Sequence, residues 1–404
     1  MNNIRVLMFG WELPPENSGG LGVACLGLSR KLNENGVDIK FVVPRKKESM
    51  RRSCFKLLSA SVNYNFEEIE FESPMTPYIT AEKYESVLKR EESDIYGENL
   101  FEEVARYREC AKKLAKYEKF DVIHAHDWLS FGAGVEAKKI TEKPLVAHVH
   151  ATEFDRGGGV NIDERVYKRE REGMEAADKV IAVSHYTKGI VVEKYGIPED
   201  KVEVAHNGVD LSEKPVGKEL LESLKKAGKK IVLFVGRITL QKGPDYFLEA
   251  AREVINCSDD IIFVVAGSGD MDRQIMRQAA ELGITDRVLF PGFIRGDELH
   301  GLYKAADLFV MPSVSEPFGL TPLESLVNGT PVLVSKQSGV SEVLTHALKV
   351  DFWDTRDMAN KILTFLNHRP LVDCLTEKGR QEVDQITWDP AANKCLEIYK
   401  SLTN

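Results

Sequence analysis

Short runs rich in apolar and β-branched residues alternate with longer segments of helical periodicity along most of the 404-residue chain. This alternation is typical of parallel βαβ units. The runs predicted to be strands are 4–9, 37–43, 122–125, 145–149, 180–184, 202–205, 231–235, 261–266, 287–290, 308–310 and 331–334. Two doubly wound sheets account for them better than one enormous sheet. The sequence therefore predicts an α/β fold with two Rossmann-like domains.

The domain boundary is predicted between Asp210 and Lys230, where a polar, lysine-rich stretch separates the last strand of one set from the first strand of the next. The predicted first domain covers residues 1–212 and the second covers 213–385. Residues 49–99 fit the alternation poorly and are interpreted as an insertion of loops, strands and a charged helix. The last segment, 386–404, is predicted to form a helix that crosses back onto the first domain.

The composition excludes several classes of protein. Apolar residues make up 43% and charged residues 29% of the chain, which is typical of a soluble globular protein. The apolar runs are far shorter than the ~20 residues of a membrane-spanning helix, and the start of the chain lacks the layout of a signal peptide. We therefore expect a cytoplasmic protein. A formal charge of −9 argues against nucleic acid as a partner.

Two smaller features bear on partners and metals. The basic run from Arg45 to Arg52 is interpreted as a solvated loop, with contact to an anionic membrane left open but not favoured. The cysteines are scattered and form no close pair, so neither a disulfide framework nor a zinc site is indicated. They are Cys25, Cys54, Cys110, Cys257, Cys374 and Cys395. No metal and no cofactor are expected.

Ligands of doubly wound sheets gather beyond the carboxyl ends of the strands, so the residues that follow each strand are the candidates. Gly19 and Gly20 follow the first strand and open a predicted helix, 23–32, where glycine allows close backbone approach to a ligand. The segment matches neither the dinucleotide fingerprint nor the P-loop, and a structural turn is the alternative.

Polar residues also follow other strands of the first half. Asp127 comes after strand 122–125, His150 after strand 145–149 and Asn207 after strand 202–205. Each residue alone is more often a satisfied strand-end group than a catalyst. Two such ends in one sheet favour Asp127 and His150 as substrate contacts.

In the second half, Arg237 and Lys242 lie on one loop after strand 231–235. The arginine can grip a diphosphate with its bidentate fork and the lysine can act as a point charge, although ordinary solvated charge is the alternative. The loop from Pro291 to Ile294 follows another strand and can offer backbone groups to a base.

The stretch MPSVSEPFGLTPLES, 311–325, carries the strongest chemical signal. Glu316 lies in its turn and Glu324 in a predicted helix, with backbone amides of a helix start between them. Such amides attract anions. Two carboxylates beside an anion site fit a nucleotide sugar. The alternative is a capping box formed by Thr321 and Glu324, with Pro322 at the first helical position.

Taken together, these motifs resemble one known family. They are PPENSGGLGV, HAHDWLS, HVHATEFDR, IAVSHYTK, HNGVD, FVGRITLQKG, PGFIRGDELHGLYKAADLFVMPS and SEPFGLTPLES. The chain resembles the retaining, nucleotide-sugar-dependent glycosyltransferases of the GT-B fold, the group that includes glycogen, starch and sucrose synthases. The resemblance covers nearly the whole chain and implies two domains facing across a cleft.

The resemblance also implies roles for single residues. His150, Glu316 and Asp127 would form the catalytic group around the donor sugar. The residues implied to bind the rest of the substrate are Arg237, Lys242, Gly319, Leu320 and Thr321 for the diphosphate, Glu324 for the ribose, Gly19 and Gly20 near the phosphates, and Asn207 beside the sugar.

The activity implied by the resemblance is metal-independent transfer of a hexose, with glucose favoured, from an ADP- or UDP-sugar to an α-1,4-glucan. One departure weakens the assignment to glycogen synthesis. Glycogen synthases usually carry a lysine before the paired glycines, and this chain has Ser18. A transferase of the same fold with a lipid-linked or small-molecule acceptor, and a non-catalytic nucleotide-sugar-binding protein, are the alternatives.

Overall fold

The structure is a computed structural model, and it describes residues 3–14, 19–44, 56–59, 100–159, 162–211 and 222–403. Ser18, the basic run 45–52 and most of the predicted insertion 49–99 lie outside the described residues. The chain divides into two compact units. The first unit comprises Met1–Thr152, Asp163–Gly208 and Trp388–Asn404, and the second unit comprises Glu153–Ile162 and Val209–Thr387.

The first unit is built on a seven-stranded sheet whose paired strands all run parallel. In sheet order the strands are β3 (Lys56–Ser59), β2 (Asp38–Val43), β1 (Arg5–Phe9), β4 (Val122–His126), β5 (Leu145–Val149), β6 (Lys179–Ala182) and β7 (Val202–Val204). Every residue of β4 and β5 is buried, as expected for central strands of a parallel sheet, although His124, His126 and His148 interrupt their apolar runs.

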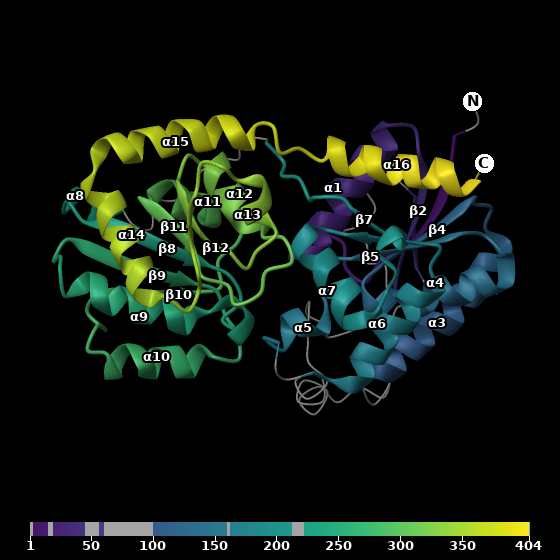
Figure 1. The fold of residues 1–404 in the computed structure, drawn as a ribbon, viewed down its shortest axis with the longest axis horizontal. Helices are drawn as coiled ribbons and strands as arrows, with labels where there is room; N and C mark the ends of the chain where they lie inside the picture. Colours follow the sequence, from purple (N-terminus) through teal and green to yellow (C-terminus); the bar gives the residue numbers. More distant parts are fainter. Residues whose placement is uncertain are drawn as a thin grey trace. The chain divides into compact units, whose positions relative to one another are not determined.

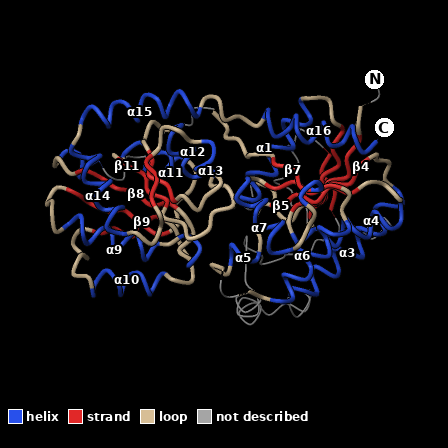
Figure 2. Tube along the Cα trace, viewed as in Figure 1, coloured by secondary structure: helices blue, strands red, loops and turns tan. Residues whose placement is uncertain are grey.

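Helices cover both faces of this sheet, as Figure 2 shows. They are α1 (Gly20–Glu34), α3 (Leu100–Tyr117), α4 (Trp128–Thr141), α6 (Glu164–Ala176), α7 (His185–Tyr195), the short η2 (Glu199–Lys201) and α16 (Asp389–Thr403). Along α3, the apolar residues at helical spacing from Leu100 to Leu114 are buried, as the periodicity predicts. The hydroxyl of Tyr107 in this stripe donates to the carbonyls of Gly10 and Val42.

The last helix packs onto the first unit, which confirms the predicted return of the chain. Figure 1 shows α16 alongside α1. At Gly27 of α1, an added Cβ would lie 2.3 Å from the Trp388 ring, so only glycine leaves room for the indole. Ala392 and Cys395 of α16 are fully buried in the same core.

The second unit has a six-stranded sheet, again with all paired strands parallel. In sheet order the strands are β10 (Val288–Gly292), β9 (Ile261–Ala266), β8 (Lys230–Val235), β11 (Leu308–Met311), β12 (Val332–Ser335) and β13 (Leu348–Val350). Its helical segments are α5 (Glu153–Arg156), α8 (Glu222–Lys226), η3 (Leu240–Lys242), α9 (Pro244–Ile255), α10 (Asp272–Glu281), α11 (Asp297–Ala305), α12 (Leu320–Val327), α13 (Val340–Val343), α14 (Thr355–Asn367) and α15 (Arg369–Val383).

Both sheets are doubly wound, as predicted. Chain order reverses between β1 and β4 in the first unit and between β8 and β11 in the second. Ligands of such sheets bind where the order reverses, beyond the carboxyl ends of the two strands. The loops after these four strands are therefore the places to search for a site. Within the described part of the chain, no helix combines the length and the apolar content needed to cross a bilayer.

Candidate active site

An ion pair joins the two loops at the reversal point of the second unit. Lys242 ends the loop after β8, and Glu316 lies in the loop after β11. The Lys242 Nζ is 2.5 Å from Oε2 of Glu316, which also accepts from the hydroxyl of Ser313 at 3.1 Å. The Glu316 side chain is 8% exposed and that of Lys242 is 22% exposed, so the lysine retains a face toward solvent.

Backbone geometry holds these loops in contact. Gly243 has φ +62°, and a Cβ at this position would lie 2.3 Å from the carbonyl oxygen of Pro312. Glycine is therefore required both for the left-handed turn and for the close approach. Gln241 adds a polar link, since its Nε2 donates to the carbonyl of Ser315 and its backbone carbonyl accepts from the Val314 amide.

The helix α12 begins at Leu320, four residues after Glu316. Its N-cap is Gly319, with φ +103°, so Leu320 and Thr321 supply the first helical amides. The alternative interpretation as a capping box is wrong, because Thr321 is inside the helix and no side chain of the N-cap residue bonds the helix start. These first amides lack intrahelical partners and form a partly positive end near the ion pair.

Glu324 lies farther along α12 and is held by a tyrosine. Its Oε2 accepts a hydrogen bond of 3.0 Å from the hydroxyl of Tyr303 in α11. Burial, reinforced by the Glu324 carboxylate, raises the pKa of Tyr303 well above its usual value. The tyrosine therefore stays a neutral donor that fixes the carboxylate.

Two further predicted residues of this unit are Arg237 and Ile294. Nη2 of Arg237 donates to Oε1 of Gln241 at 3.3 Å, which sets the guanidinium on the same loop as Lys242. Ile294 is half-buried in the loop between β10 and α11. The structure therefore brings Lys242 and Glu316 into contact and places Arg237 beside them through Gln241.

A segment that the sequence places in the first domain groups with the second unit. It is Glu153–Ile162, which contains α5. Its buried Asp155 accepts a hydrogen bond of 2.5 Å from the hydroxyl of Ser315, the residue before Glu316. The sequence gives no signal for this contact, because the two residues are 160 positions apart.

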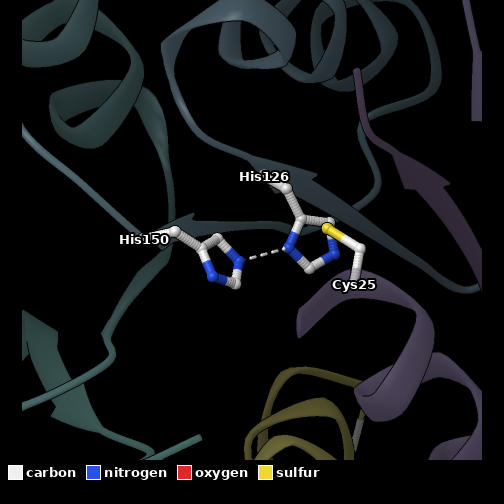
Figure 3. A group of neighbouring side chains, drawn as sticks. All are labelled: Cys25, His126 and His150. Carbon is white, nitrogen blue, oxygen red and sulfur yellow. Dashed lines mark hydrogen bonds between the residues drawn. The ribbon is translucent and has the colours of Figure 1, made fainter. Parts of the chain in front are cut away.

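In the first unit, the ends of β4 and β5 carry a cluster of histidines. Nδ1 of His126 and Nε2 of His150 share a hydrogen bond of 2.8 Å, as Figure 3 shows. Asp127 is buried with φ +59°, and its Oδ1 accepts from the amides of His150 at 2.6 Å and Ala151 at 3.3 Å. The predicted pair, Asp127 and His150, is therefore in direct contact.

A second hydrogen-bonded pair lies one step back along the same strands. Nε2 of His124 is 3.2 Å from Nδ1 of His148, and Nδ1 of His124 is 2.5 Å from the hydroxyl of Tyr399 in α16. Burial lowers the pKa of His124 and of His150 to about 3, and it lowers the pKa of His126 and His148 well below the usual value. All four imidazoles are neutral at pH 7.

The remaining candidates of the first unit lie at a helix start and after a strand. Gly19 is the N-cap of α1 and Gly20 is its first residue, where an added Cβ would meet no atom of the described residues within 4 Å. Asn207 is buried after β7, which lies two strands beyond β5 in the sheet.

Sequence reasoning did not single out four side chains that shape these sites. They are Gln241, Ser313, Tyr303 and His126. All four lie inside motifs quoted for the resemblance, but the sequence does not show which partners they contact. The second unit can stabilise an anion with its cations and helix amides. The first unit can present a neutral imidazole.

Comparisons with known proteins match a different family model to each half of the chain. The family described as Glycosyltransferase Family 4 matches residues 18–213, and the one described as Glycosyl transferases group 1 matches residues 218–382. The chain is 30% identical to an uncharacterized glycosyltransferase of Methanocaldococcus jannaschii, over 98% of both chains. It is 29% identical to a D-inositol 3-phosphate glycosyltransferase of Salinispora arenicola, over 69% of this chain and 68% of the relative.

A solved structure shares the fold across the whole length. It is an Anabaena protein in complex with UDP-glucose, with a TM-score of 0.72 and 18% identity, and the match covers 99% of this chain and 100% of that one. The two doubly wound sheets, the matched families and the full-length relative agree. The chain belongs to the group 1 glycosyltransferases of the GT-B fold.

Proposed function

We propose that this glycosyltransferase moves a hexose, with glucose favoured, from an ADP- or UDP-sugar to an α-1,4-glucan, with retention of anomeric configuration and without a metal cofactor. The observation that carries the proposal is the contact between Lys242 and Glu316 next to the first amides of α12. This arrangement combines a cation and helix amides for a diphosphate with a carboxylate for sugar hydroxyls. The UDP-glucose complex of the Anabaena protein supports a nucleotide-sugar donor.

In the proposed reaction, the bond from the sugar C1 to the diphosphate oxygen breaks, and the acceptor oxygen bonds to C1 on the same face. The acceptor proton passes to the departing diphosphate. Lys242, Arg237 and the amides of Leu320 and Thr321 stabilise the charge that grows on the leaving group. Glu316, His150 and Asp127 orient the donor sugar, and Glu324 binds the ribose.

A second acceptor class is favoured by a specific observation. The Salinispora relative is named for transfer to D-inositol 3-phosphate, a small phosphorylated acceptor. Ser18 also stands where glycogen synthases usually carry a lysine. Transfer to a small phosphorylated acceptor is therefore the alternative to a glucan.

The test is a screen for release of nucleoside diphosphate. ADP-, UDP- and GDP-glucose are each offered with glycogen, with D-inositol 3-phosphate and with water alone. We expect release that depends on glycogen, and a product whose new linkage is α by NMR. Release that depends only on inositol 3-phosphate would select the alternative acceptor. Tight nucleotide binding with no release for any acceptor would contradict the transfer.

The screen also needs a matched variant. Lys242→Ala, purified in the same way, is expected to lose most of the release at every donor. Release at the wild-type rate in this variant would contradict the role proposed for Lys242.

A further inference from the structure

The ring of His150 is held by a side chain that the proposed reaction does not use. His126 ends β4, and its Nδ1 is 2.8 Å from Nε2 of His150. Both side chains are buried, and their ring centroids are 5.1 Å apart (Figure 3). The contact exists because β4 and β5 are adjacent and parallel, so their carboxyl ends meet at the same edge of the sheet.

The same place could be interpreted as a metal site, because Cys25 lies beside the pair. One ligand atom from each of Cys25, His126 and His150 lies within 4.8 Å of the other two. Zinc bonds to imidazole nitrogen measure about 2.0–2.1 Å, which places two nitrogens of a tetrahedral site roughly 3.3 Å apart. The observed 2.8 Å between the two facing nitrogens is instead the length of a direct hydrogen bond. The geometry favours a hydrogen-bonded imidazole pair.

This hydrogen bond restricts what His150 can offer a ligand. A neutral imidazole has one N–H and one acceptor nitrogen, and Nε2 of His150 is already engaged by His126. Its other nitrogen, Nδ1, is buried and has no hydrogen-bond partner among the described residues. Nδ1 is therefore the ring atom of His150 left for a substrate.

The backbone of His150 is fixed from the same direction. Asp127, the next residue after His126, accepts hydrogen bonds from the amides of His150 and Ala151. Consecutive residues at the end of β4 thus hold the ring and the main chain of His150 separately. The ring cannot turn about its χ angles without losing the bond to His126.

We propose that His126 is a positioning residue, which holds the His150 ring so that Nδ1 meets a hydroxyl of the donor sugar. The inference rests on the proposed function, in which His150 contacts that sugar. It adds a link between the two rings: the bond between His126 and His150 sets the tautomer of His150, and with it whether Nδ1 acts as donor or as acceptor.

The kinetic test replaces His126 and compares three variants. His126→Phe keeps the ring volume and removes the bond, so we expect kcat to fall by about 10-fold to 100-fold while KM for the donor changes less than about threefold. His126→Asn is expected to recover much of kcat, because its amide nitrogen lies where Nδ1 of histidine lies. His126→Gln, whose amide lies one bond farther out, is expected to recover less.

The matched control is His124→Phe. This residue lies on the same strand, is equally buried and loses two hydrogen bonds on substitution, to His148 and Tyr399. It has no bond to His150, so kcat should stay within about threefold of wild type. An equal fall in kcat for His124→Phe and His126→Phe would show a general packing effect and overturn the proposal.

Nitrogen NMR of histidine-labelled protein gives a readout independent of turnover. In wild type, Nε2 of His150 should show a hydrogen-bonded shift that disappears in His126→Phe, and donor addition should move the Nδ1 resonance. If wild type transfers no sugar, the proposed function fails. The inference then depends on this spectrum alone. It is overturned if saturating UDP-glucose and ADP-glucose leave the Nδ1 resonance of His150 unmoved. It is also overturned if the Nε2 shift of His150 in wild type is that of a nitrogen without a hydrogen bond.

Discussion

The two units place different chemistry at equivalent positions of similar sheets. In the first unit, the strand ends next to the reversal point carry neutral, buried imidazoles bonded to one another. In the second unit, the corresponding loops carry a lysine and a glutamate in contact, with the lysine partly exposed. The first cluster can orient a group and the second can balance charge. The shared topology therefore fixes where a site lies, and the residues after each strand decide what the site does.

The largest expected difference between the two units is in how acid changes their unfolding free energy. The pKa values of His124 and His150 are lowered to about 3 in the folded protein, so the unfolded chain binds more protons below pH 6.5. The stability that these histidines contribute is fully present above pH 6.5 and is lost as pH falls toward 3. Between pH 8 and pH 5, we expect the two together to remove about 4 kcal/mol from the unfolding free energy of the first unit.

Denaturant titration with tryptophan fluorescence can follow this loss in one unit. Trp11, Trp128 and Trp388 belong to the first unit, and Trp353 belongs to the second. Trp353 is 57% exposed, so Trp353→Phe leaves a signal from the first unit alone at small cost. An unfolding free energy of the first unit that stays constant from pH 8 to pH 5 would contradict neutral burial of the histidines.

Removing the cation of the second cluster should have the next largest effect. Lys242→Ala is expected to lower kcat by about 10²-fold or more, because the charge on the departing diphosphate loses a preorganised partner. Lys336→Ala is the matched control, since Lys336 also pairs with a carboxylate, Asp351, but is 53% exposed. Near-normal turnover in Lys242→Ala, with the fold verified by circular dichroism, would contradict the assignment of charge stabilisation to this unit.

The close contact between the two loops of the second unit can be tested by one methyl group. Gly243→Ala would place Cβ 2.3 Å from the Pro312 carbonyl at φ +62°, and we expect a loss of about 2–3 kcal/mol in unfolding free energy. Gly329→Ala is the control, with φ +84° and no atom within 4 Å of the added Cβ. It should cost only about 1 kcal/mol. Equal losses would mean that the loops separate easily.

The smallest expected effect concerns Glu324. Tyr303→Phe removes the hydrogen bond of 3.0 Å to its carboxylate, which we expect to cost about 1 kcal/mol and to raise KM for the donor about threefold. The effect should fall on KM because Glu324 is assigned to the ribose and not to the reacting centre. Tyr246→Phe, in which the ring still packs on Phe352, is a suitable control. An unchanged KM in Tyr303→Phe would remove the support for Glu324 as a ribose contact.

Much of the fold follows from the sequence, because parallel strands buried on both faces are mostly apolar, as Ile261–Ala266 is. Strand β13, Leu348–Val350, escaped prediction since three residues with a central lysine carry no such pattern. The capping-box interpretation placed the start of α12 two residues too late. Thr321-Pro322 resembles an N-cap followed by a first-turn proline, but Gly319 adopts φ +103° and is itself the N-cap.

The chemical sites were predictable only as sets of residues. The sequence places Asp127 and His150 at neighbouring strand ends, and the structure joins them. It does not reveal that His126 bonds to His150, because that contact depends on strand register and ring rotation. The segment Glu153–Ile162 groups with the second unit through contacts such as that between Asp155 and Ser315, and local pattern cannot anticipate contacts between distant parts of a chain.

The position of α16 has a consequence for how the protein is made. The core of the first unit includes Trp388 and Tyr399, which the ribosome adds only after the whole second unit has been synthesised. The second unit can therefore complete its fold as soon as Thr387 has left the exit tunnel. The first unit, although translated first, must wait with an open face along α1. Nascent-chain experiments should find its final protection appearing last, in the reverse of the order of translation.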